Sequence, residues 1–273
     1  MKIIQIRNSD MRELPKTKNC ILEFDNGWLT IWFNRPEKKN ALSDVLLDDI
    51  KDTVKSVHDD RSVRGILFRG RGGSFCSGAD LDGIKKIASS GENARDLAID
   101  MSKKVGSTLE TINKAPQITV SVVEGASMAG GFGFACATDI LITKDDARYA
   151  LTETKIGLTP AQIVPYVLNR LGFAQARRLL LLGSSFDGQE AFNMGMADYI
   201  AQNDDGLNNL IDKVKSDVRK CAPNAIAITK RIISENHVID AQKAAEFFAD
   251  CVIHEEGREG FASFFEKRKP SWS

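Results

Sequence analysis

Short apolar runs and helical repeats of apolar residues alternate along the first two thirds of the chain. Two of the runs flank Asn26-Gly27, a strong two-residue turn signal, and predict a β-hairpin. After Ser43, apolar residues recur at helical spacing to about Asp59, which predicts a helix capped by that serine. The predicted strands are residues 20–24, 28–33, 65–69, 118–123, 139–143 and 148–151, and a long helix is predicted at 92–113.

From Pro160 onward the pattern predicts one helix after another, at residues 161–171, 174–182, 188–194, 206–221, 223–235, 239–254 and 257–267. The alternation of strands and helices up to about residue 200 predicts an α/β fold built from repeated ββα units. We therefore expect a ββα core over residues 1–200 and a helical C-terminal region over residues 201–273.

Two glycine-rich segments, at residues 74–80 and 124–133, lie where a strand is expected to pass into a helix. Glycine lets the backbone approach a ligand closely, and the first turn of a helix offers unpaired N–H groups with a favourable dipole. If the amides of Ala79 and Gly130 converge on one oxygen atom, they form an oxyanion hole, in which one donor stabilises a transition state by about 3 kcal/mol. Taken alone, either segment is equally consistent with a tight turn and close helix packing.

The charge of the chain is balanced, with 37 basic and 37 acidic residues among 273. A general binder of nucleic acids or membrane surfaces needs a basic excess, so we expect neither partner. The five cysteines are scattered, without the spacing of a metal site or a disulfide framework, which favours free thiols and no metal. Because there is no apolar run of about 18 residues and no signal-peptide pattern, we expect a cytoplasmic protein.

Several motifs together carry a resemblance to a known family. In chain order they are residues 34–42 (NRPEKKNAL), 75–81 (FCSGADL), 124–125 (EG) with 129–131 (AGG), 136–140 (CATDI), 153–158 (ETKIGL) with Pro160, and 266–272 (EKRKPSW). Each motif is weak alone, but their order and spacing are specific. From Trp28 to its end, the chain resembles the crotonase (enoyl-CoA hydratase/isomerase) superfamily.

This resemblance implies a spiral of ββα units, homotrimers or hexamers assembled through the C-terminal helical region, and an acyl-coenzyme A thioester as substrate. Coenzyme A is then part of the substrate, and no separate cofactor is expected. The resemblance makes Ala79 and Gly130 the oxyanion-hole residues. The residues that it places near the substrate are Lys38, Lys39, Ala41, Ser77, Gly78, Asp80, Leu81, Gly131, Gly133 and Lys267. The lysines among them are candidate phosphate contacts, in part from a neighbouring subunit, and the alternative is that they are only solvated charges.

Hydratases of this superfamily use two glutamates, and the chain matches one of them. Glu153 stands at the second position, whereas Gly133 replaces the first. Partial burial of Glu153 would raise the pKa of its carboxyl into the range that suits proton transfer. The alternative is a surface carboxylate that caps a helix or pairs with Lys155. Phe132 and Phe134, on either side of Gly133, offer no group for proton transfer.

A single carboxylate suits double-bond isomerisation, because one base can lift a proton from one carbon and return it to another. The segments 130–134 and 157–167, however, most resemble bacterial hydratases of methylglutaconyl-CoA, in leucine degradation, and of isohexenylglutaconyl-CoA, in terpene degradation. Such a substrate brings its own carboxylate, which we expect to orient or deprotonate the attacking water. We therefore predict a hydratase (a lyase) for a branched 2-enoyl-CoA. The alternatives are a Δ3,Δ2-enoyl-CoA isomerase and a non-catalytic protein that binds coenzyme A.

Overall fold

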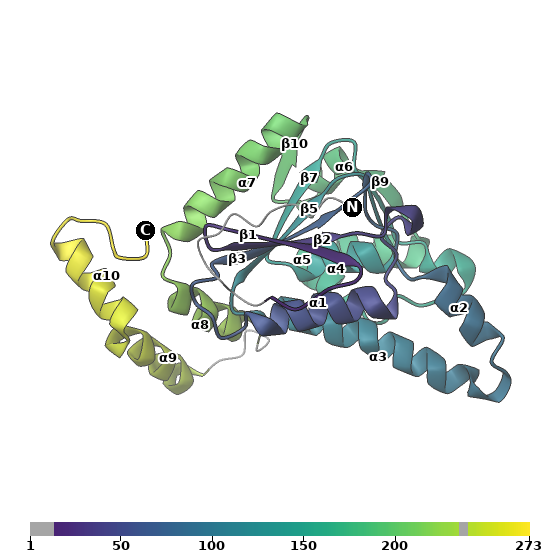
Figure 1. Cartoon of the computed structure of the whole chain (residues 1–273), viewed down its shortest axis with the longest axis horizontal. Helices are drawn as coiled ribbons and strands as arrows, with labels where there is room; N and C mark the ends of the chain where they lie inside the picture. Colours follow the sequence, from purple (N-terminus) through teal and green to yellow (C-terminus); the bar gives the residue numbers. More distant parts are fainter. Residues whose placement is uncertain (1–13, 235–239) are drawn as a thin grey trace.

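The computed structural model describes residues 14–234 and 240–273, and its larger sheet has six strands in the order β1-β2-β3-β5-β7-β10 (Figure 1). β1 and β2 form the predicted antiparallel hairpin, and every later pair of neighbours is parallel. The bounds are β1 Cys20–Asp25, β2 Trp28–Phe33, β3 Gly65–Gly70, β5 Ile118–Val123, β7 Ile140–Lys144 and β10 Tyr199–Ala201.

A smaller sheet, in the order β4-β6-β8-β9, is made of three-residue strands: β4 Ser74–Cys76, β6 Ala126–Met128, β8 Arg148–Ala150 and β9 Ser185–Asp187. β4, β6 and β8 are parallel, and β9 is antiparallel to β8. After each of β3, β5 and β7 the chain crosses from the large sheet to the small one before a helix or a 3-10 turn follows. This repeated path is the predicted series of ββα units.

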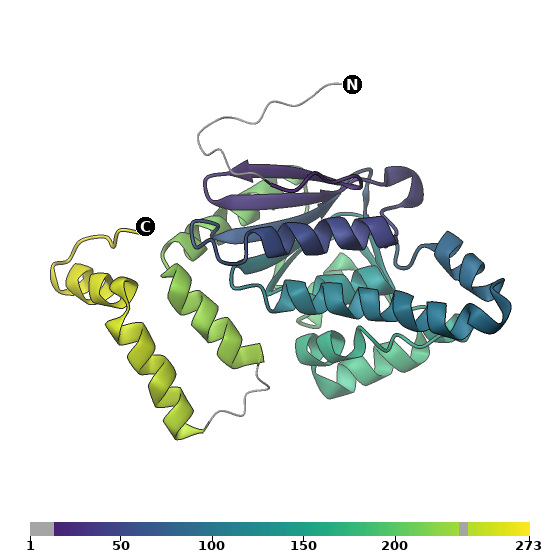
Figure 2. The same ribbon diagram turned by 60° about the horizontal axis from the view of Figure 1, so that its bottom comes forward.

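The helices are α1 Asp44–Ser56, α2 Leu81–Ala88, α3 Ala94–Asn113, α4 Gly130–Ala137, α5 Val164–Leu182, α6 Gly188–Asn193, α7 Asp204–Arg219, α8 Pro223–Ser234, α9 Ala241–Ile253 and α10 Glu255–Phe265. Short 3-10 turns are η1 Pro36–Lys38, η2 Gly91–Asn93 and η3 Glu153–Ile156. The Ser43 hydroxyl accepts a hydrogen bond from the Leu46 amide at 3.2 Å, which confirms it as the cap of α1. α1 and α3 lie side by side beneath the large sheet (Figure 2).

β3 illustrates how the large sheet is covered on both faces. Ile66 and Phe68 belong to the apolar cluster on one face, whereas Leu67 between them packs on the other face with residues of α7. Successive side chains of a strand point to opposite faces, so a strand buried on both sides is apolar throughout. In the first cluster the ring of Phe134 lies 5.1 Å from that of Phe33 and 5.0 Å from that of Phe68. These edge-to-face contacts fix α4 on the sheet.

The structure differs from the sequence prediction mainly in its short elements. β4, β6, β9 and β10 were not predicted, because three residues are too few for a periodic signal. The eight-residue helix α2 was not predicted either. The break predicted between the helices at 161–171 and 174–182 is confirmed: within α5 the backbone is not helical at Gly172, where φ is 70°. One predicted helix has its end at residue 235 and the next has its start at residue 239, and both positions lie outside the described residues, as do residues 1–13. Within the described ranges, no helix is long and apolar enough to cross a membrane.

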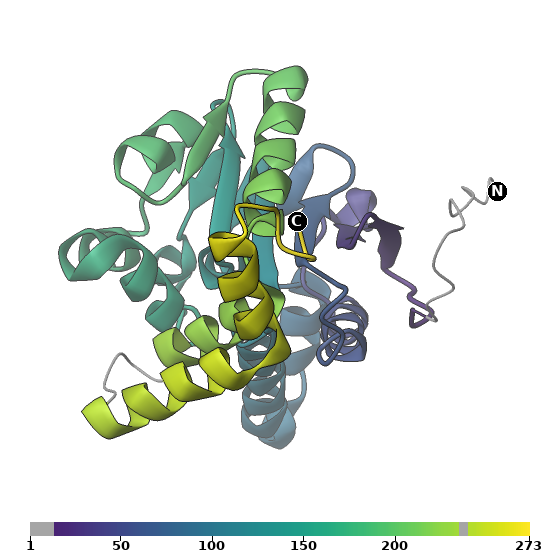
Figure 3. The same ribbon diagram turned by 90° about the vertical axis from the view of Figure 1, so that its left-hand side faces the viewer.

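α7 packs against the large sheet, whereas α9 and α10 lie at one end of the molecule, beyond α8 (Figures 1 and 3). The division of the chain at residue 200 stays a prediction. A buried ion pair attaches α8 to the core: the Lys230 Nζ atom lies 2.6 Å from an Asp139 carboxylate oxygen and donates to the Gln117 carbonyl at 2.7 Å. The same Asp139 oxygen accepts from the Thr119 amide at 2.7 Å. Burial lowers the pKa of Lys230, and the Asp139 charge opposes this shift.

Asp139→Asn should destabilise the protein by about 3–5 kcal/mol, because it leaves the Lys230 charge buried without its partner. The exposed pair of Lys144 and Asp204 is the matched control, and Asp204→Asn should cost at most about 1 kcal/mol. Urea unfolding of the two variants compares these losses. Equal losses would mean that the Lys230–Asp139 pair contributes no more than a surface pair.

Candidate active site

The three residues with predicted catalytic roles follow neighbouring strands of the small sheet. Ala79 comes just after β4, Gly130 just after β6, and Glu153 just after β8. Because these strands are parallel and adjacent, their carboxyl ends lie at one edge of the sheet, the usual place for a ligand in such sheets. The small sheet thus brings together three segments that are distant in the sequence.

The backbone around Ala79 is held by Leu42. The Leu42 amide donates to the Gly78 carbonyl at 2.7 Å, and its carbonyl accepts from the Asp80 amide at 3.3 Å. Since successive N–H groups of an extended chain point to opposite sides, the Ala79 N–H points away from Leu42. The second junction lies close by: a methyl group added to Gly130 would lie 3.9 Å from the Ala79 nitrogen. The two predicted oxyanion-hole amides are therefore neighbours.

Gly130 is the first residue of α4, and the turn before it is strained. Ala129 has φ 47° and ψ −117°, a conformation that costs a residue other than glycine about 1–3 kcal/mol. Its amide donates to the Ala150 carbonyl at 2.7 Å, which ties this turn to β8. No side chain caps α4 at this end. The first amides of α4 are thus available to a ligand, and the sequence gives no signal of the strain at Ala129.

A second layer of contacts fixes the Ala79 junction. The fully buried Asn40 side chain accepts from the Arg35 amide at 2.8 Å and donates to the Ser74 carbonyl at 2.7 Å. The Arg35 guanidinium donates to Asp80 at 2.9 Å, while the other oxygen of Asp80 accepts from the Asp82 amide and caps α2. Both oxygens of Asp80 are therefore engaged within the protein. Asn40 and Arg35 belong to the motif at 34–42, but sequence reasoning assigned neither of them a role.

Glu153 is half-buried at the start of η3. Burial raises the pKa of its carboxyl, opposed by a hydrogen bond to its own backbone amide. Its Oε2 atom is buried and has no hydrogen-bond partner. Lys155 is exposed, and no cation in the described part of the chain pairs with Glu153. These contacts do not fit a surface carboxylate in an ion pair, and they give a group suited to proton transfer.

Gly133 lies where a side chain has no room. A Cβ atom added to Gly133 would overlap the Cγ2 and Cβ atoms of Ile163, which is itself buried. Ile163, in the loop before α5, therefore fills the space into which a glutamate at position 133 would extend. Phe132 and Phe134 are fully buried in the core, so neither side chain takes the place of the missing glutamate. The sequence alone did not indicate the role of Ile163.

The other residues predicted near the substrate have varied surroundings. Gly131 packs so closely on the Cys76 carbonyl that no larger residue fits. The Ser77 amide donates to the Lys39 carbonyl at 3.0 Å, and Ala41 is buried. Lys38 pairs with Asp82 at 2.8 Å. Leu81, Lys39 and Lys267 are exposed. α10, which precedes Lys267, lies at the opposite end of the molecule from α2 (Figure 1). Contacts of these lysines with phosphates stay predictions.

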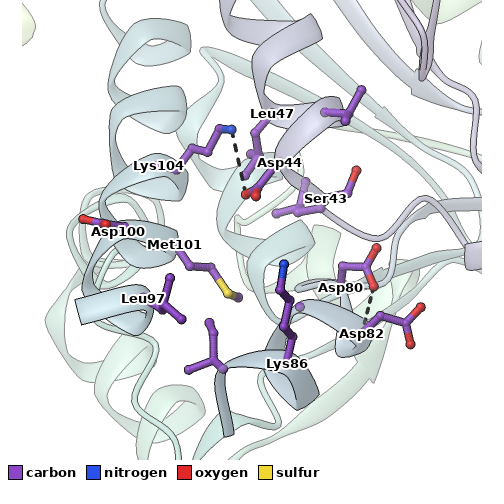
Figure 4. Close-up of a pocket in the computed structure, with 14 residues that line it drawn as sticks. Ser43, Asp44, Leu47, Asp80, Asp82, Lys86, Leu97, Asp100, Met101 and Lys104 are labelled. Carbon is purple, nitrogen blue, oxygen red and sulfur yellow. Dashed lines mark hydrogen bonds and ion pairs between the residues drawn. The ribbon is translucent and has the colours of Figure 1, made fainter. Parts of the chain in front are cut away.

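A cavity of about 520 Å³ adjoins the Ala79 junction. It lies between the start of α1, α2 and α3 (Figure 4). Leu42, the bridge partner of Ala79, and Asp80, the residue after it, are among the residues that line the cavity. The cavity is large enough for a medium-sized acyl chain.

Comparisons with known proteins identify the family of this chain. The family model described as "Enoyl-CoA hydratase/isomerase" matches residues 23–273. The chain belongs to this family. It is 39% identical to Pseudomonas aeruginosa AtuE, whose structure matches with a TM-score of 0.88 over 93% of this chain and 99% of that one. A hydratase/isomerase from Marinobacter aquaeolei is 35% identical, with a TM-score of 0.88 over 93% and 98%.

A curated relative, the crotonyl-CoA hydratase of Syntrophomonas wolfei, is 28% identical over 261 residues, which cover 93% of this chain and 98% of the relative. The family and these likenesses confirm the expected crotonase fold, with two mixed sheets and C-terminal helices. They also identify the protein as an enzyme of the enoyl-CoA hydratase type. An acyl-CoA thioester is accordingly the class of its substrate.

Gly130→Pro should abolish activity, because proline has no amide hydrogen to donate to the thioester oxygen. A helix tolerates proline at its first position, so the fold should survive, as circular dichroism can verify. Gly130→Ala is the matched control: it keeps the amide, and its methyl group would lie 3.1 Å from the flexible end of Leu42. A folded, fully active proline variant would show that Gly130 is not an oxyanion donor.

Glu153→Gln should reduce turnover by about 10²-fold or more, the lower end of what general acid–base catalysis contributes. It should also change the pH dependence of stability. Because burial raises the pKa of Glu153 in the folded protein, the wild type should lose stability relative to the variant as pH rises from the ordinary glutamate pKa through the raised one. Steady-state kinetics and urea unfolding at several pH values measure both effects.

The exposed Glu92 provides the control for this pair of measurements. Glu92→Gln should leave turnover and the pH profile of unfolding unchanged. Wild-type turnover in Glu153→Gln would make Glu153 a structural residue.

Proposed function

We propose that the enzyme hydrates a branched 2-enoyl-CoA that carries a second carboxylate, such as methylglutaconyl-CoA or isohexenylglutaconyl-CoA. The main support is the contact of Gly133 with Ile163. At the position where hydratases of the superfamily have their other glutamate, this chain has no side chain and no space for one. A substrate that brings its own carboxylate can supply the missing group.

In this proposal the oxyanion hole stabilises the charge that forms during the addition. The oxygen of water bonds to C3, and the electrons of the C2=C3 double bond move toward the thioester, so that an enolate forms. Its negative charge falls on the thioester oxygen, between the amides of Ala79 and Gly130. Fixed amides stabilise this charge without reorganisation, which is where a site of this kind contributes most.

Two carboxyl groups move the protons. The substrate carboxylate accepts a proton from the attacking water, and Glu153 gives its proton to C2. The raised pKa of Glu153, caused by burial, favours the protonated form that this step needs. The proton on the substrate carboxylate then passes through solvent to Glu153. One water molecule is added, and Glu153 returns to its starting state.

Isomerisation of a 3-enoyl-CoA to a 2-enoyl-CoA is the second candidate function, favoured by the lone carboxyl of Glu153. In that reaction Glu153 must begin ionised, because it removes a proton from C2 and returns it to C4. The two functions therefore differ in the sign of their pH dependence. Hydration should slow as pH rises through the pKa of Glu153, whereas isomerisation should accelerate.

We also infer that the enzyme assembles as a homotrimer or a hexamer through its C-terminal helices. Large apolar side chains of α9 and α10 are exposed, namely Phe248, Ile253, Phe261, Phe264 and Phe265. They accompany an apolar cavity of about 500 Å³ between α8, α9, α10 and Trp272. Exposed apolar patches of this kind are typical of protein interfaces. Assembly would also allow Lys267 of one copy to approach the site of another.

Hydration rates on a small panel of thioesters test the proposal. The value of kcat/KM should be at least about 10²–10⁴ times larger for methylglutaconyl-CoA than for crotonyl-CoA, because crotonyl-CoA lacks the second carboxylate. The loss of the conjugated double bond, followed by ultraviolet absorbance, measures both rates. Their pH profiles should fall as pH rises through the pKa of Glu153.

Gly133→Glu combined with Ile163→Gly should reduce the difference in kcat/KM between methylglutaconyl-CoA and crotonyl-CoA. The second change clears the space for the new carboxylate. Ile163→Gly alone is the control and should not improve crotonyl-CoA hydration. Efficient hydration of crotonyl-CoA by the wild type would contradict substrate assistance. Turnover of a 3-enoyl-CoA that rises with pH, without hydration of either thioester, would identify an isomerase.

A further inference from the structure

The cavity beside the Ala79 junction is walled by apolar residues and rimmed by charges. Its apolar wall includes Leu42, Leu47, Leu97 and Met101, from the α1 segment and α3. α2 borders the remaining side with Asp82, Gly83, Lys86 and Ile87, and none of its residues is buried. A cavity of about 520 Å³ with an apolar wall has room for a ligand of medium size.

The charges around the cavity are nearly all paired. Lys104 pairs with Asp48 at 2.7 Å and lies 3.8 Å from Asp44. Asp80 pairs with Arg35, and Asp82 with Lys38, as described above. Within the described ranges this leaves Lys86 and Asp100 as the charged residues of the cavity without an ion-pair partner.

These two unpaired side chains point in different directions. Figure 4 shows the ammonium group of Lys86 in the middle of the cavity, between Met101 and Asp80, whereas the carboxylate of Asp100 points away from it. The one unpaired charge that enters the cavity is therefore positive. An ammonium beside apolar walls favours a ligand with an apolar body and an anionic group.

We propose that this cavity receives an acyl chain and that Lys86 recognises a carboxylate on it. The inference rests on the proposed function, and it names the residue that selects a dicarboxylic acyl chain over a neutral one. Leu42 lines the cavity, and its side chain would also lie 3.1 Å from a methyl group added to Gly130, so the cavity adjoins the proposed oxyanion hole. In a glutaconyl chain one methylene separates the carboxylate from C3. An ammonium that holds one carboxylate oxygen leaves the other free to face the attacking water.

Binding of two saturated thioesters tests this selection without turnover. 3-Methylglutaryl-CoA carries the carboxylate, and isovaleryl-CoA is the similar branched chain without it. By calorimetry the wild type should bind 3-methylglutaryl-CoA about 10- to 100-fold more tightly, the usual contribution of a hydrogen bond to a charged group. Lys86→Met should remove this preference and leave isovaleryl-CoA affinity within about twofold. Lys86→Arg should keep it.

Lys85 is the matched control, because it is exposed on the same helix and does not line the cavity. Lys85→Met should bind both thioesters as the wild type does. An undiminished preference in Lys86→Met, or an equal loss for both thioesters, would overturn the role of Lys86. The proposed hydration would stand in either case, since it is tested separately, by the hydration rates of the wild type on the glutaconyl thioesters and on crotonyl-CoA.

Discussion

The parallel pairing of β4, β6 and β8 is the constraint on which the candidate active site depends. Each strand has only three residues, but together they align the segments that hold Ala79, Gly130 and Glu153 at one edge of the small sheet. The Ala129 amide adds a hydrogen bond to the Ala150 carbonyl, which joins the segment of Gly130 to the segment of Glu153. A shift of this pairing by one residue would turn the backbone amides away from each other.

The site is kept at a cost in stability. Ala129 adopts an unfavourable backbone conformation, and Glu153 has a buried oxygen without a hydrogen-bond partner. The surrounding contacts offset both: Asn40 and Arg35 fix the loop beside Ala79, and Phe134 fixes α4 on the core. Strain and unsatisfied polar atoms of this kind are frequent at catalytic sites. A polar group whose hydrogen bonds are all made within the protein has no free donor or acceptor for a substrate.

The long elements of the fold could be predicted from the sequence, and the short ones could not. The hairpin at Asn26-Gly27 and the Ser43 cap were predicted because turn and cap residues act within a few positions of themselves. β4 and β6 were missed because each has only three residues, and only their pairing with strands that are distant in the chain makes them strands. The kink at Gly172 was predicted as a break between two helices, since glycine marks an interruption but not its angle.

The sequence by itself determined the order of the long strands and helices, the candidate amides, and the absence of a carboxylate at position 133. These depend on residue type and local spacing, which a single sequence contains. The tertiary structure alone decided that Ile163 fills the space beside Gly133, that Glu153 is half-buried and unpaired, and that Lys86 points into a cavity between α1, α2 and α3. Burial, steric overlap and charge pairing are properties of residues that meet only after folding, so no local pattern records them.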